Sequence, residues 1–144
     1  MKLESVLSMV FGTPEEITGD GSCPTYMLRW NLASAFGRKV YIHHFVGDDW
    51  SVDMHDHPRM FVSIGLVGSY IEHTPEGTTE YVAPWARTFP AEHKHRITLR
   101  PGKTCWTMVI VGEITRQWGF WHDGQWMHWR EYVDYAKTTG RKDC

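Results

Sequence analysis

The sequence predicts one all-β domain, a sandwich or a barrel, with a short helix at each end. The chain has 144 residues, which is the size of a single domain. Short runs of apolar and β-branched residues alternate with Gly- or Pro-containing breaks, a pattern typical of antiparallel β-structures. Helical spacing of apolar residues occurs near the two termini. We therefore expect a single domain over residues 1–144.

The elements follow from these patterns in chain order. Apolar residues at Leu3, Val6, Leu7 and Val10 predict an amphipathic helix over residues 2–11. A loop rich in Gly and Pro follows it. The predicted strands are 26–33, 39–46, 60–67, 70–73, 79–83, 96–100, 104–112 and 117–121. A turn at residues 68–69 separates the third strand from the fourth, and a closing helix is predicted over residues 129–137.

Composition excludes several classes of protein. The formal net charge is −2, so there is no bulk positive field to attract nucleic acid or an anionic membrane. No apolar run approaches the roughly 18 residues of a membrane span. The three cysteines, Cys23, Cys105 and Cys144, show no paired spacing, so no disulfide framework is expected. The N-terminal residues lack the features of a signal peptide. These observations predict a cytoplasmic protein without nucleic-acid or membrane partners.

Histidines provide the candidate site. His55 and His57 are two residues apart, and on a strand such residues point to the same side. Both imidazoles would then face one volume, as two ligands of a metal ion do. Downstream, a Pro-containing loop leads to His95 at the start of a predicted strand. A third imidazole from this segment would complete a three-nitrogen site.

Two alternatives stay open at this point. His93 lies on the same side of an extended chain as His95, and it is the rival third ligand. A barrel without metal, whose histidines make hydrogen bonds or face solvent, is the other reading. If a metal binds, neutral imidazoles suit Zn, Fe, Ni and Cu.

The two histidine segments resemble the two sequence motifs of the cupin superfamily. The first motif has a His-x-His pair, a Glu and a Gly, matched here by His55, His57 and Gly68. The second has a Pro, a short loop and a His, matched by Pro90 and His95. The resemblance covers about residues 39–112 and implies a cupin-type jelly-roll barrel with its site inside.

One departure from the motif concerns its Glu, whose position falls at Phe61 or Val62. The remaining three-His site is similar to that of the cysteine dioxygenase group of cupins. This resemblance implies one divalent ion, namely Fe, Zn, Ni or Mn, and dioxygenase-like oxidation of a small polar substrate. Two other functions remain in view: a metal-free sugar-nucleotide isomerase or epimerase, and a non-catalytic accessory module.

Further residues are candidates for the chemistry. Glu72 could be a fourth ligand, a general base or a carboxylate that orients a histidine, and Tyr70 could orient the substrate. An arginine inside the barrel could bind an anionic group, and the candidates are Arg59, Arg87 and Arg96.

Three segments also resemble small cupin-like proteins of phages and bacteria: 55–70, 104–112 and 118–121. For a phage-encoded protein, the expected location is the cytoplasm of the host. The small-molecule substrate is the expected partner, and a homodimer is one option for the assembly.

Overall fold

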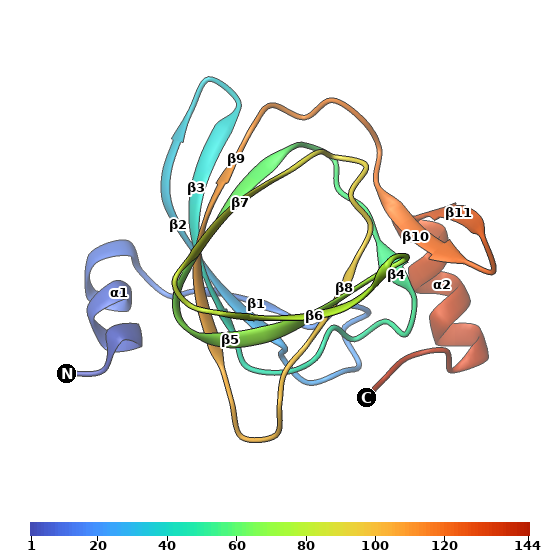
Figure 1. Cartoon of the computed structure of the whole chain (residues 1–144), viewed down its shortest axis with the longest axis horizontal. Helices are drawn as coiled ribbons and strands as arrows, with labels where there is room; N and C mark the ends of the chain where they lie inside the picture. The colour runs from blue at the N-terminus through green and yellow to red at the C-terminus, as the bar shows by residue number, and fades with distance from the viewer.

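The computed structural model describes residues 1–144, and its strands form a ring when viewed down the shortest axis of the molecule (Figure 1). The elements, in chain order, are α1 (Leu3–Phe11), β1 (Glu15–Ile17), β2 (Met27–Ala35), β3 (Arg38–Phe45), β4 (Met54–His55), β5 (Phe61–Thr74), β6 (Gly77–Val82), β7 (Trp85–Phe89), β8 (Arg96–Thr98), β9 (Cys105–Val111), β10 (Gly119–His122), β11 (Gln125–His128) and α2 (Trp129–Thr139). The two helices lie outside the ring on opposite sides. Neither is long and apolar enough to cross a membrane.

The strands form two antiparallel sheets. The larger has eight strands in the order β1-β2-β3-β9-β5-β6, and β7 and β8 also pair with β5. The smaller has the order β11-β10-β4. A bridge between His55 and His95 links β4 to the segment before β8. The prediction of an all-β fold with a short helix at each end is confirmed.

The predicted turn at residues 68–69 is wrong. Strand β5 runs through this point without reversing, and it changes its pairing register with β9 between Gly65 and Val67. Gly68 has a φ of 84°, and a Cβ added there would lie 2.1 Å from the carbonyl oxygen of Thr104. Gly68 therefore lets the strand bend against β9. As a result, one continuous strand carries both Ser63 and Glu72.

Four strands were not predicted from the sequence. Strands β1 and β4 have three and two residues, too few to show an alternating pattern. Strand β7 lies between Pro84 and Pro90, which mark a loop in a sequence. Strand β11 has only four residues and lies directly before α2. All four are held by pairing with longer or neighbouring strands.

The expectation of no disulfide is also wrong. Cys23 and Cys144 form a disulfide bond, with 5.6 Å between their Cα atoms. The two cysteines are 121 residues apart in the sequence, so no local spacing pattern predicts that they pair. Cys105 is the free thiol and is fully buried. The cysteine content consequently gives no support for a reducing compartment.

Candidate metal centre

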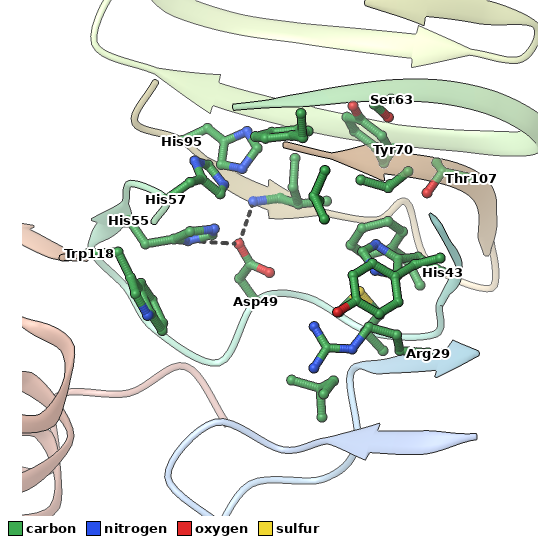
Figure 2. Close-up of a pocket in the computed structure, with 18 of the residues that line it drawn as sticks. Arg29, His43, Asp49, His55, His57, Ser63, Tyr70, His95, Thr107 and Trp118 are labelled. Atoms are coloured by element: carbon green, nitrogen blue, oxygen red, sulfur yellow. Dashed lines mark hydrogen bonds and ion pairs between the residues drawn. The ribbon is translucent and has the colours of Figure 1, made fainter. Parts of the chain in front are cut away.

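A cavity of about 460 Å³ lies inside the ring of strands. Figure 2 shows that His55, His57 and His95 lie together on one side of it. Tyr70 and Ser63 of β5 lie on its wall, as does Phe61. Phe61 and Ser63 therefore face the same cavity as the three histidines.

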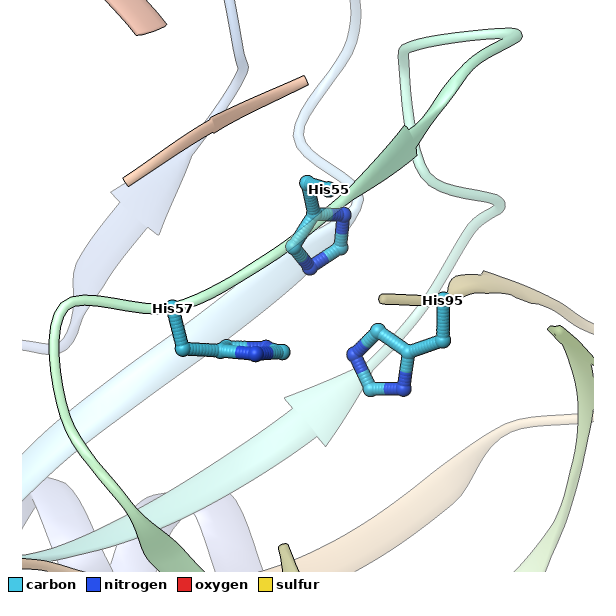
Figure 3. Close-up of side chains that lie close together, drawn as sticks. All are labelled: His55, His57 and His95. Carbon is cyan, nitrogen blue, oxygen red and sulfur yellow. The ribbon is translucent and has the colours of Figure 1, made fainter. Parts of the chain in front are cut away.

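Three short segments bring the histidines together. His55 ends β4, His57 follows in the next loop, and His95 precedes β8. The backbone N–H of His55 donates to the carbonyl oxygen of His95 over 2.9 Å, and the backbone N–H of His95 donates to the carbonyl oxygen of His55 over 3.0 Å. The ring centroids lie 5.2, 5.0 and 4.9 Å apart. One ring nitrogen from each residue lies within 4.8 Å of the other two (Figure 3).

Hydrogen bonds hold two of the rings from behind. The Nδ1–H of His57 donates to the carbonyl oxygen of His93 over 3.0 Å. The Nδ1–H of His95 donates to Oε1 of Glu72 over 2.8 Å. A proton on Nδ1 of a neutral imidazole leaves the lone pair on Nε2. Both rings therefore present an Nε2 acceptor to the shared volume.

The third ring has a more distant partner. Nδ1 of His55 lies 3.6 Å from Oδ2 of Asp49, as the dashed line in Figure 2 marks. The same oxygen accepts a hydrogen bond from the backbone N–H of Ile97 over 2.8 Å. Burial raises the pKa of Asp49 to about 7, against the opposing effect of the Ile97 N–H. Asp49 lies in a loop, where the sequence showed only a break between strands.

The chemistry of this donor set fits a divalent metal ion. Burial lowers the pKa of all three imidazoles, and the neighbouring histidines lower those of His55 and His57 further. They therefore stay neutral at pH 7, and neutral imidazole is the form that binds metals. An acceptor behind a ligating imidazole, which fixes its tautomer and orientation, is a regular feature of protein metal sites.

Glu72 lies behind this site. Its side chain is 2% exposed and accepts hydrogen bonds from His93, His95 and Arg87, each at 2.8 Å. Burial alone would raise the pKa of Glu72, but these three donors hold it well below its ordinary value. Glu72 does not line the cavity. Of the three roles considered for it, orienting a histidine matches this position.

His93 lies beside the site. Its Nε2–H donates to Glu72, and its ring packs 4.6 Å from that of Phe89. With Glu72 and His95 it forms a second group of potential ligands. All three members of that group are already joined by hydrogen bonds, because His93 and His95 both donate to Oε1 of Glu72. The cavity is lined by His95 and not by His93.

Asp56, which the sequence did not single out, lies between the two histidines of the pair. It is 1% exposed. Its carboxylate accepts hydrogen bonds from the backbone N–H of Gly119 and from the indole N–H groups of Trp121 and Trp126, at 2.8 to 3.1 Å. Arg116 forms an ion pair with it at 3.1 Å. Asp56 thus fastens the histidine segment to β10 and β11.

The three candidate arginines lie in different places. Arg87 pairs with Glu72, and Arg96 pairs with Asp143 and donates to the carbonyl oxygen of Ser51. Arg59 lines the cavity and donates to two backbone carbonyls. Burial and the Glu72 carboxylate raise the pKa of Tyr70 above its ordinary value, so this cavity residue remains a phenol.

Comparison with known proteins supports the architecture. No protein-family model and no curated protein matches the sequence. Among solved structures, the polyketide cyclase RemF of Streptomyces resistomycificus is 21% identical with a TM-score of 0.53, over 60% of this chain and 64% of that one. The chain thus spans less than two thirds of the cyclase.

Two further structures are similar. A sugar phosphate isomerase of the cupin superfamily from Silicibacter pomeroyi is 14% identical, with a TM-score of 0.55 over 68% of this chain and 66% of that one. FeII HppE is 9% identical, with a TM-score of 0.55 over 69% of this chain and 56% of that one. At such identities a match shows the fold alone. The protein therefore has the fold of the cupin superfamily, as its two histidine segments led us to expect.

Proposed function

We propose that this protein is a metal-dependent enzyme that acts on a small molecule inside the barrel. His55, His57 and His95 would hold one divalent ion through Nε2. The observation that carries this proposal is the set of hydrogen bonds behind His57 and His95, which leaves the Nε2 lone pairs of both rings free within a cluster of three histidines whose ring nitrogens lie within 4.8 Å of one another.

The reaction class that we propose is oxidation with dioxygen. A divalent ion held by the three imidazoles would supply a Lewis acid, and iron would add redox chemistry. The similar fold of FeII HppE supports iron as the first ion to test. Glu72 would act through His95 as a positioning residue, by keeping its proton on Nδ1. Tyr70, as a phenol on the cavity wall, would donate a hydrogen bond to the substrate.

Metal content tests the proposal. We expect the purified protein to hold one equivalent of metal by elemental analysis, and His55→Ala and His95→Ala to lose it. His93→Ala separates the two rival ligands, and we expect that variant to keep the metal. His73→Gln is the matched control, because His73 lies on β5 and hydrogen-bonds Thr98 and Thr78 away from the cavity.

Two results would count against the proposal. Metal content unchanged by His55→Ala and His95→Ala would remove this ligand set. Loss of metal in His93→Ala and His95→Ala, with retention in His55→Ala, would move the site to the neighbouring group of Glu72, His93 and His95. A metal-free protein that a sugar nucleotide stabilises against heat would instead favour the isomerase alternative.

A further inference from the structure

A second group of polar side chains lies in the cavity, on the wall formed by β2, β3 and β9. Arg29 lies directly opposite His43 in the register of β2 and β3. His43 in turn lies opposite Thr107 in the register of β3 and β9. Directly opposed residues of antiparallel strands share one face of the sheet. All three line the cavity, and we call them the polar row.

Two atoms of the polar row have unused hydrogen-bonding capacity. Nε2 of His43 and Oγ1 of Thr107 are buried and have no partner among the other groups of the protein. Thr107 is 1% exposed. Buried polar groups without a partner are rare in folded proteins, because they lose their hydrogen bonds to water without replacement. A ligand in the cavity could supply both missing partners.

Arg29 gives the row its charge. Its Nε and Nη2 donate to the Glu15 carboxylate at 3.0 and 2.7 Å, which leaves Nη1 without a bond to that residue. Burial and the positive charge of Arg29 lower the pKa of His43 to about 3, so the imidazole is neutral at pH 7. The row therefore combines a guanidinium, which is paired with Glu15 through Nε and Nη2, with a hydroxyl and a neutral ring. Such a set suits the two oxygens of a carboxylate.

The rest of the cavity indicates the body of the ligand. Figure 2 draws the three histidines on one side and the polar row on the other. Apolar side chains line much of the wall, among them Met27, Phe45, Ile97 and Val109. These side chains offer no hydrogen bonds to the several hydroxyl groups of a sugar. The volume of about 460 Å³ is that of an ordinary small-molecule site.

We propose that the substrate is a small carboxylic acid with a largely apolar body, whose carboxylate binds the polar row. Its reactive part would face the three histidines. The placement of this reactive part rests on the proposed metal-dependent function, whereas the binding of the carboxylate does not. The two proposals can therefore fail separately.

The experiment uses protein stripped of metal with a chelator, so that a carboxylate bound directly to a metal ion cannot give the signal. Hexanoate, octanoate and 4-phenylbutyrate are titrated calorimetrically, each beside its uncharged amide. We expect at least one acid to bind about tenfold or more tightly than its amide, because only the acid forms a charge-assisted pair with Arg29. Arg29→Gln should abolish this preference.

Variants of Thr107 test the hydroxyl separately. Thr107→Val keeps the shape of the side chain, and we expect it to weaken acid binding about tenfold. Thr107→Ser keeps the hydroxyl and should restore the binding. Thr88→Val, on the exposed face of β7, is the control that should change nothing.

Three outcomes would overturn the proposal: no acid binds, acids and amides bind equally well, or the preference survives both Arg29→Gln and Thr107→Val. Because metal-free protein is used, these outcomes do not depend on the ligand set of the metal site. Preference for acids in a protein that also fails to bind metal would refute the proposed function and support the polar row.

Discussion

The buried carboxylate of Glu72 fixes which nitrogen of His95 carries the proton. An ionised carboxylate only accepts hydrogen bonds, so His95 must place its proton on Nδ1 and its lone pair on Nε2. We predict that Glu72→Gln lowers the affinity for the metal by about 10- to 100-fold, because the amide can turn an N–H toward His95. Competition with a chelator of known affinity measures this change.

Glu80→Gln is the matched control for this prediction. Glu80 pairs with Arg100 over 2.7 Å on the exposed face of β6. Its variant makes the same carboxylate-to-amide change at a side chain that bonds Arg100 and no histidine. Its metal affinity should equal that of the unmodified protein. Equal losses of affinity in the two variants would mean that Glu72 has no specific role in positioning His95.

Strands were predictable where the alternation of side chains is long enough to read. Residues of β3, β5 and β9 were recognised because each strand has one face toward the interior of the ring. The continuity of β5 was not predicted, because a glycine such as Gly68 is compatible with either a turn or a bend in a strand. Glu72 was placed on a separate strand for that reason. Its distance from His95 depends on β5 pairing with β8 beyond the bend.

Asp56 joins the histidine segment to the small sheet, and a prediction at the scale of elements follows. Asp56→Ala would leave the indole N–H groups of Trp121 and Trp126 and the N–H of Gly119 without their buried acceptor. We expect a loss of about 3–5 kcal/mol in the free energy of unfolding, since the Arg116 guanidinium also loses its partner. Urea denaturation measures the loss.

Asp123→Asn provides the comparison for Asp56→Ala, because asparagine tolerates the positive φ of 48° at this position. The side chain of Asp123 is 85% exposed, at the turn between β10 and β11. Removing its carboxylate should change the free energy of unfolding by less than about 1 kcal/mol. If both aspartates gave such small changes, Asp56 would not be the attachment point of the small sheet.

The parts of the site that the sequence did not reveal depend on contacts between distant segments. The His-x-His spacing and the Pro-led His95 are local patterns, and both were recognised. Asp49, Arg29 and Thr107 carry no local signal, because their positions on the cavity follow from strand register and loop path. The pairing of Cys23 with Cys144 likewise joins the loop between β1 and β2 to the C-terminal residue.

This disulfide belongs to a set of contacts that hold the C-terminal segment on the molecule. Arg141 pairs with Asp53 at 2.8 Å, and the backbone N–H of Asp143 donates to the carbonyl of Trp50. We predict that Cys144→Ser lowers the free energy of unfolding by about 2–5 kcal/mol, because the bond closes a long loop in the unfolded chain. Reductant should destabilise the unmodified protein similarly and leave Cys144→Ser unchanged. A further loss of stability in the reduced variant would contradict this account.

Stability of the whole molecule should also depend on pH through its buried histidines. The pKa of His43 is about 3 in the folded protein, where burial and Arg29 disfavour the charged ring, and about 6.5 when unfolded. Above pH 6.5 neither state binds this proton. Between pH 6.5 and 3 only the unfolded chain binds it, so the free energy of unfolding falls as the pH falls, by at most about 1.4 kcal/mol per pH unit.

In metal-free protein, His43→Gln should therefore lose less stability than the unmodified protein between pH 7 and pH 5, as urea denaturation at each pH would reveal. If His43→Gln and the unmodified protein showed the same pH dependence, His43 would not be a buried neutral group, and its place in the polar row would lose support.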